Sequence, residues 1–202
     1  IADEVVTGFG RLGTMFGSEH YNLRPDIITI AKGLTSAYAP LSGSILSNKI
    51  WKVLEQGTDE LGPIGHGWTY SAHPIGAAAG IANLQLLDSM NLISNVKDVG
   101  KYMLDELKNA FDSHPLVGEV RGDGMLSSLE FLENKDNLKF FDPAKKIGMQ
   151  VSANLLKEGV IGRAMPHGDI LGLAPPLCLS KSEADIIVSS LKKSVDKVHS
   201  EI

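Results

Sequence analysis

The chain has 202 residues, a length that allows one or two domains with a buried core. Hydrophobic residues make up 43% of it, and together with 21 glycines and 9 prolines this is typical of a globular α/β protein. The net charge of −5 argues against nucleic acid and against an anionic membrane surface as partners. The single cysteine, Cys178, excludes an internal disulfide and a cysteine-based zinc site. It suits a reducing compartment, and we therefore expect a cytoplasmic protein.

The first residues form a β-like run, Ile1 to Val6, and the first of them is not methionine. Because this run begins inside a core element, we expect the chain to be the C-terminal half of a longer protein. Residues 1–6 and 26–31 are rich in β-branched side chains and are predicted to be buried parallel strands. The glycine-rich residues between them, 8–25, are predicted to be loop.

The rest of the first half is predicted to hold one more strand and two helices. Residues 42–47 have a strand pattern, and a helix is predicted through Ile50 and Leu54. After a glycine-rich stretch over residues 57–69, Pro74 opens a run of small and apolar residues. Since these residues are apolar on nearly every side, they predict a helix buried in tight contact with other elements.

Near residue 92 the composition changes from glycine-rich and apolar to charged and amphipathic, which predicts a domain boundary between residues 1–92 and 93–202. Apolar residues at helical spacing predict helices over about residues 94–112 and 144–155, and a capping-box pattern from Ser180 to Glu183 opens the last helix. Predicted strands at 117–120 and 126–132 flank a turn at 121–124, and a hairpin joins 160–163 to 170–174. The fold class is therefore predicted to be α/β.

Gly8 to Gly13 match the G-x-G-x-x-G pattern of dinucleotide-binding turns. That function also requires a helix that opens at the pattern and an acidic residue about 20 positions later. The following residues show no sustained helical period and no matching acidic position. The pattern is therefore interpreted as a tight glycine loop.

Asp3 and Lys32 each lie at or near the carboxyl end of a predicted parallel strand, where open α/β sheets bind their ligands. A lysine that follows an apolar run is expected to be partly desolvated, which lowers its pKa and makes the amine nucleophilic. A nearby aspartate can hold a pyridinium nitrogen protonated. On spacing alone, both residues could equally be solvated surface charges.

The segments that contain these two residues closely resemble the signature of class III aminotransferases, which depend on pyridoxal 5'-phosphate (PLP). The matching segments follow the family's order and cover essentially the whole chain: Asp3 to Arg11, Pro25 to Ser36, Pro40 to Gly43, Thr69 to Pro74 and Ala174 to Leu177. The resemblance implies the fold type I of PLP-dependent transferases. Residues 1–92 would then be an incomplete PLP-binding large domain, and residues 93–202 the C-terminal small domain.

The resemblance also implies roles for single residues. The aspartate matching Asp3 pairs with the PLP pyridine nitrogen, and the lysine matching Lys32 holds the cofactor covalently. The valine matching Val5 packs on a face of the ring, although a core strand residue would look the same. The threonine matching Thr69 binds the cofactor phosphate of the neighbouring subunit, which implies a homodimer with its active site at the interface. Without the resemblance, Thr69 would be interpreted as a hydroxyl in a turn or cap.

Arg163 bears on the substrate class. In omega-aminotransferases an arginine at the matching position pairs with the substrate carboxylate and swings away for amines that lack one. A guanidinium group suits bidentate binding of a carboxylate, whereas the residue by itself would suggest an ordinary surface ion pair. Val6, where several amino-acid-specific relatives carry glutamine, also favours the omega-amino-acid:pyruvate type.

Some positions depart from the family pattern. Leu12 stands where threonine is usual, and Ala72 stands where glycine is usual. The family's phosphate loop and its ring-stacking aromatic residue would lie before residue 1. No metal site is predicted, because the following histidines show no metal-ligand spacing: His20, His66, His73 and His167.

The sequence therefore predicts a PLP-dependent aminotransferase that moves an amino group from an omega-amino acid or amine to a keto acid such as pyruvate. Two alternatives stay open. A related PLP decarboxylase or aminomutase would keep Asp3 and Lys32 and would differ around Arg163. A truncated, inactive remnant of the fold would bind PLP weakly or not at all.

Overall fold

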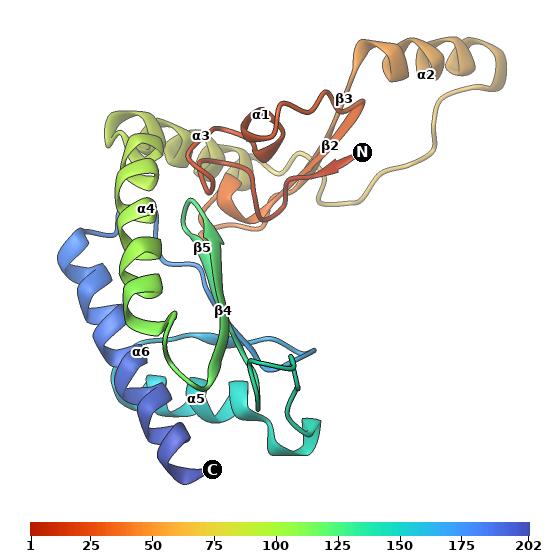
Figure 1. Cartoon of the computed structure of the whole chain (residues 1–202). Coiled ribbons are helices and arrows are strands. Elements are labelled where there is room, and N and C mark those ends of the chain that lie inside the picture. The colour runs from red at the N-terminus through yellow and green to blue at the C-terminus, as the bar shows by residue number, and fades with distance from the viewer. The chain divides into compact units, whose positions relative to one another are not determined.

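The computed structural model describes residues 1–202, which divide into two compact units, Ile1–Ile93 and Ser94–Ile202. In Figure 1 the first unit is coloured from red to yellow-green and the second from green to blue. None of the helices combines the length and the apolar character needed to span a lipid bilayer.

The first unit is built on a three-stranded sheet in the order β1 (Ala2–Asp3), β2 (Ile27–Ile30), β3 (Gly43–Leu46). The predicted parallel pairing is confirmed, with Asp3 opposite Thr29, and β3 is antiparallel to β2. The strand predicted over residues 1–6 is shorter than expected, and the predicted burial of β1 and β2 was wrong. The chain turns directly after β1 because Gly8 N–H donates to the carbonyl of Glu4, and every residue of β2 is only half-buried.

Four helical segments accompany this sheet: α1 (Gly17–His20), the 3₁₀ turn η1 (Lys32–Leu34), α2 (Asn48–Leu61) and α3 (Pro74–Ser89). The short helix α1 lies in a segment predicted to be loop. The position of α3 was predicted correctly, but its burial was not. Only Gly76, Gly80 and Leu87 are buried, whereas Ile75 is 68% exposed, because the turn and loop that follow β2 pack on a single face of the helix.

The second unit contains an antiparallel sheet in the order β4 (Val117–Asp123), β5 (Leu126–Phe131), β7 (Ile170–Leu173), β6 (Arg163–Ala164). The predicted hairpin between residues 160–163 and 170–174 is confirmed as the pairing of β6 with β7. The predicted turn at 121–124 was too early. Arg121 continues β4 opposite Ser128 and forms ion pairs with Glu119 and Glu130, so the chain reverses only at Gly124 and Met125.

Helices α4 (Leu92–Phe111), α5 (Ile147–Lys157) and α6 (Lys181–Glu201) pack with this sheet, and the 3₁₀ turn η2 (Pro143–Lys145) precedes α5. Helices α4 and α6 lie side by side, joined by a hydrogen bond from the Tyr102 hydroxyl to Asp185 (Figure 1). The predicted capping box of α6 is present at Ser180 and Glu183. The apolar faces of the helices meet in one core that includes Val96, Met103, Leu107, Val151, Leu155, Leu191 and Val195.

Helix α4 approaches the β4–β5 turn so closely that only glycine fits at position 100. A Cβ atom at Gly100 would lie 2.7 Å from the carbonyl carbon of Gly124, which is backbone and cannot rotate away. We therefore expect Gly100→Ala to lower the free energy of unfolding by about 1–3 kcal/mol, because the added methyl group overlaps the Gly124 backbone and pushes α4 away from the β4–β5 turn. Lys97→Ala, on the exposed face of the same helix, is the control and should stay within about 0.5 kcal/mol of wild type. Thermal unfolding of the full-length protein measures both, and an unchanged melting temperature for Gly100→Ala would contradict this packing.

Candidate active site at the end of the parallel strands

Asp3 is the last residue of β1, and its carboxylate is held on one side only. The Thr29 hydroxyl and the Val5 N–H both donate to Oδ1, at 2.9 Å and 3.1 Å. The Val5 N–H, the Thr29 hydroxyl and the positive charge of Lys32 together lower the pKa of Asp3 below its ordinary value. Oδ2 has no partner within the chain, so Asp3 presents an exposed, ionised oxygen at the end of the sheet.

Lys32 follows the neighbouring strand β2 and begins η1. Its backbone has a φ of +39°, a left-handed conformation that a residue with a side chain rarely adopts. The expectation that Lys32 is partly desolvated was wrong, because its side chain is exposed and the apolar run before it is itself only half-buried. The structure nevertheless brings Lys32 near enough to Asp3 for its charge to act on that carboxylate.

Glu4 is a structural member of the site that sequence reasoning missed. It is 2% exposed and accepts hydrogen bonds from Gly17 N–H at 2.8 Å, from Ser18 N–H at 2.6 Å and from the Thr7 hydroxyl. Burial raises the pKa of Glu4, but these hydrogen bonds outweigh burial, so the pKa lies below its ordinary value. Glu4 thereby fastens the start of α1 to the end of β1, and no local pattern signals bonds to residues this distant in sequence.

The glycine-rich loop between β1 and α1 packs against the turn that contains Lys32. Phe9 is buried, and a Cβ atom at Gly33 would lie 3.2 Å from the Cβ of Phe9. Phe9, Gly10 and Gly13 all have positive φ, and no helix of useful length opens at the G-x-G-x-x-G pattern. The interpretation of this segment as a tight loop is confirmed. Val5 lies half-buried in the turn after β1 rather than in a strand.

Thr69 lies in an exposed loop between α2 and α3. Ser71 N–H donates to the carbonyl of Trp68, and Trp68 N–H donates to the Ser71 hydroxyl, so residues 68–71 form a hydrogen-bonded turn. The large side chains on both sides of Thr69 are exposed, Trp68 by 74% and Tyr70 by 82%. Ala72 has a φ of +54°, which gives a physical reason for the glycine usual at this position.

Arg163 belongs to the second unit. It lies on the edge strand β6, where its backbone pairs with Gly172, and its side chain is exposed. Its guanidinium group makes no hydrogen bond or ion pair within the chain. The group is therefore not engaged in the surface ion pair that the residue alone would suggest.

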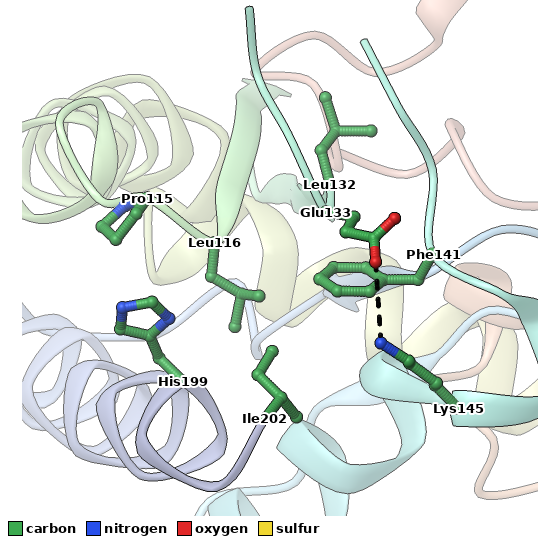
Figure 2. A pocket seen from close by; sticks show the side chains of 8 residues that line it. All are labelled: Pro115, Leu116, Leu132, Glu133, Phe141, Lys145, His199 and Ile202. Atoms are coloured by element: carbon green, nitrogen blue, oxygen red, sulfur yellow. Dashed lines mark ion pairs between the residues drawn. The ribbon is translucent and has the colours of Figure 1, made fainter. Parts of the chain in front are cut away.

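A hollow of about 220 Å³ lies within the second unit, and Arg163 is not among the residues that line it (Figure 2). Apolar side chains such as Leu116 and Phe141 line it, and Lys145 forms a 3.7 Å ion pair with Glu133 across its edge. Because none of the predicted site residues lines this hollow, it is not part of the candidate site.

Comparison with known proteins gives one consistent result. A profile of the family described as aminotransferase class-III matches residues 1–195. The chain is 55% identical to a diaminobutyrate–2-oxoglutarate transaminase of Halomonas elongata and 40% identical to a putrescine–pyruvate aminotransferase of Pseudomonas aeruginosa. Each match covers 98% of this chain and 42% of the relative. An (S)-enantioselective omega-transaminase from Thermomicrobium roseum is 39% identical, with a TM-score of 0.90 over 97% of this chain and 42% of that structure. The chain thus spans less than half the length of these proteins.

The hydrogen bonds of Glu4 lead to a pH-dependent stability prediction. Glu4→Gln should lower the free energy of unfolding by about 2 kcal/mol at pH 7, because an amide cannot accept on both sides of the group. Since the folded pKa lies below the unfolded value of about 4.3, this stabilisation is complete above that pH and is lost as the pH falls through the folded pKa. Urea unfolding at pH 7 and at progressively lower pH measures the difference between variant and wild type.

Glu19→Gln is the matched control, because Glu19 lies exposed on α1, the short helix whose first N–H groups donate to Glu4. It should change the free energy of unfolding by less than about 0.5 kcal/mol at either pH. A Glu4→Gln difference that stayed constant as the pH fell would disprove the ionised, hydrogen-bonded state assigned to Glu4.

Proposed function

Because this chain belongs to the class III aminotransferases, we propose that the protein containing it moves an amino group from an omega-amino acid or amine to a keto acid such as pyruvate. The match over residues 1–195 and the transaminase relatives support the reaction type, and the omega-transaminase structure supports the substrate class. The observation that carries the proposal is the free Oδ2 of an ionised Asp3 beside Lys32 at the end of two parallel strands.

These residues fit PLP as the cofactor. The pyridine nitrogen needs an anionic partner in order to stay protonated, and Oδ2 of Asp3 is an ionised oxygen whose orientation is held by two bonds to Oδ1. Lys32 provides a primary amine near this carboxylate, and Val5 in the turn after β1 provides an apolar side chain for the ring face. When bound, PLP supplies an electron sink for the carbon from which a proton is removed.

The chain's own residues perform three tasks in this proposal. Lys32 would hold the cofactor through Nζ, and the same primary amine would take up and return a proton at that nitrogen. Asp3 holds the proton on the pyridine nitrogen through Oδ2. Arg163 binds the carboxylate of the keto acid, and its guanidinium group is free to do so because it has no partner within the chain.

We further propose a homodimer in which Thr69 contributes its hydroxyl to the cofactor phosphate of the neighbouring subunit. The exposed aromatic side chains beside Thr69 support this, as does a hollow of about 400 Å³ over α2 that Trp51, Leu54 and Ile64 line. Exposed aromatic side chains and apolar hollows are both enriched at protein interfaces. In the same scheme residues 1–92 belong to the PLP-binding large domain and residues 93–202 form the small domain. The free Cys178 supports a reducing cytoplasm.

The test of the cofactor site is chemical labelling. Borohydride reduction of the PLP-loaded full-length protein, followed by peptide mapping, should find the pyridoxyl group on Lys32. Lys49→Ala should leave this labelling unchanged, because Lys49 is paired with Asp26 on the surface. A pyridoxyl group on another lysine would refute the assignment of Lys32. The absence of any pyridoxyl group would mean that the protein does not hold PLP covalently, and would refute the proposed cofactor site.

The substrate class is tested by Arg163→Ala. If Arg163 binds carboxylates, the half-reaction with the keto acid should lose about one to two orders of magnitude in kcat/KM, since a charged bidentate contact contributes roughly 1.5–3 kcal/mol. The half-reaction with an amine that lacks a carboxylate should change far less. Stopped-flow absorbance of each half-reaction measures both. Equal losses would mean that Arg163 supports the fold rather than the substrate, and would reopen the alternative of a decarboxylase or aminomutase.

A further inference from the structure

The turn that contains Lys32 has a strained backbone. Lys32, Ser36 and Ala37 have φ values of +39°, +49° and +63°, and none of them is glycine. Such a conformation is unfavourable for a residue with a side chain and persists only where its surroundings determine it. The turn's own backbone bonds are few: Leu34 N–H donates to Ala31, Thr35 N–H to Lys32 and Tyr38 N–H to Thr35. The buried Thr35 hydroxyl also donates to the carbonyl of Ala39, but none of these bonds ties the turn to another helix or strand. Additional contacts must therefore hold this segment.

One side chain on α3 supplies these contacts. The Asn83 amide donates to the carbonyls of Gly33 at 2.7 Å and Leu34 at 3.2 Å, directly after Lys32. Its carbonyl oxygen accepts from the Ser36 hydroxyl at 2.6 Å. A single half-buried amide thus spans the strained segment with both its donor and its acceptor side.

The helix that bears Asn83 is itself packed closely against the residues that follow this turn. Gly76 and Gly80 precede Asn83 on one face of α3, and Leu87 follows it. A Cβ atom at Gly80 would lie 3.3 Å from the Leu41 side chain, and one at Gly76 would lie 3.1 Å from the carbonyl of Pro40. Asn83 is therefore presented to the turn from a rigid element at close range.

We propose that Asn83 is a positioning residue for Lys32. By fixing the backbone carbonyls of Gly33 and Leu34, it sets the direction in which the Lys32 side chain leaves the sheet, and so the place of Nζ relative to Asp3. This inference rests on the proposed function for its catalytic consequence. The three hydrogen bonds between Asn83 and the turn, which we call the clamp, can be tested without any cofactor.

The first experiment uses the full-length protein without PLP. Hydrogen exchange of the peptide covering residues 32–38 should be at least about 10-fold faster in Asn83→Ala than in wild type, because the turn opens locally once its bonds are lost. Asn95→Ala is the matched control. Asn95 also donates from one amide to two carbonyls, those of Leu177 and Leu179, but does so in the second unit, so residues 32–38 should exchange as in wild type.

The second experiment follows the amine half-reaction of the PLP-loaded protein. In Asn83→Ala its limiting rate should fall about 10- to 100-fold, because a misplacement of about 1 Å of the proton-transferring group has an effect of that size. The amine concentration for half the limiting rate should change less than about 3-fold. Asn83→Asp keeps the bond from Ser36 but loses both donor bonds, and should resemble Asn83→Ala. Ser36→Ala, an exposed change that leaves the fold intact, should slow the rate only about 2- to 3-fold.

The outcomes separate the clamp from the proposed function. Unchanged exchange of residues 32–38 in Asn83→Ala overturns the clamp. Asn83→Asp, which also loses both donor bonds, decides in the same way should Asn83→Ala not fold. Faster exchange with a wild-type limiting rate overturns the positioning role and leaves a structural bond. A wild-type protein with no half-reaction rejects the proposed function, and in that case the exchange result alone decides whether Asn83 holds the turn.

Discussion

The parallel pairing of β1 with β2 is the constraint on which the candidate site depends. It consists of Ala2 opposite Ile28 and Asp3 opposite Thr29, followed by a bond from Glu4 N–H to the carbonyl of Thr29. Because the strands are parallel, both end at the same edge of the sheet, and residues far apart in sequence leave it side by side. The surrounding contacts end each strand at this edge: the Glu4 carboxylate after β1, and the strained turn with its Asn83 bonds after β2.

The neighbouring residues Asp3 and Glu4 show how burial separates a functional carboxylate from a structural one. Hydrogen bonds lower the pKa of both groups. Glu4 is buried, and both of its oxygens accept bonds from the loop and α1, so it is not accessible to a ligand. Asp3 is exposed, and both of its bonds end on the same oxygen. A strand that alternates its side chains between two faces places one carboxylate in the loop packing and the other at the edge of the sheet.

Local patterns predicted the second unit better than the first. Helical spacing and a capping box were enough for α4 and α6. In the first unit, strand ends were enough to place Asp3 and Lys32 at the same edge of the sheet. The identity of the cofactor and the roles of Thr69 and Arg163 came from resemblance, since an exposed hydroxyl and an exposed guanidinium group have no local signature. Long-range bonds escaped prediction altogether, because neither Glu4 to Ser18 nor Asn83 to Gly33 leaves a spacing pattern. The exposure of Lys32 and of α3 was not predicted for another reason. An apolar sequence indicates that a segment is buried in some contact, but it does not indicate which residues make that contact.

The loop before α3 links a departure from the family pattern to a physical cost. Ala72 adopts a left-handed backbone at a position where glycine is usual, and a methyl group in that conformation costs on the order of 1 kcal/mol. Its neighbour His73 accepts the Ile75 N–H at Nδ1 and caps the helix, so the chain direction on the far side of Ala72 is fixed. The turn at Trp68 and Ser71 fixes the near side. Strain between two fixed segments persists because neither can rotate to relieve it. Hydrogen bonds hold the turn after Lys32 in the same way. Both loops with proposed PLP contacts therefore keep their left-handed residues, because bonds fix the chain on either side of them.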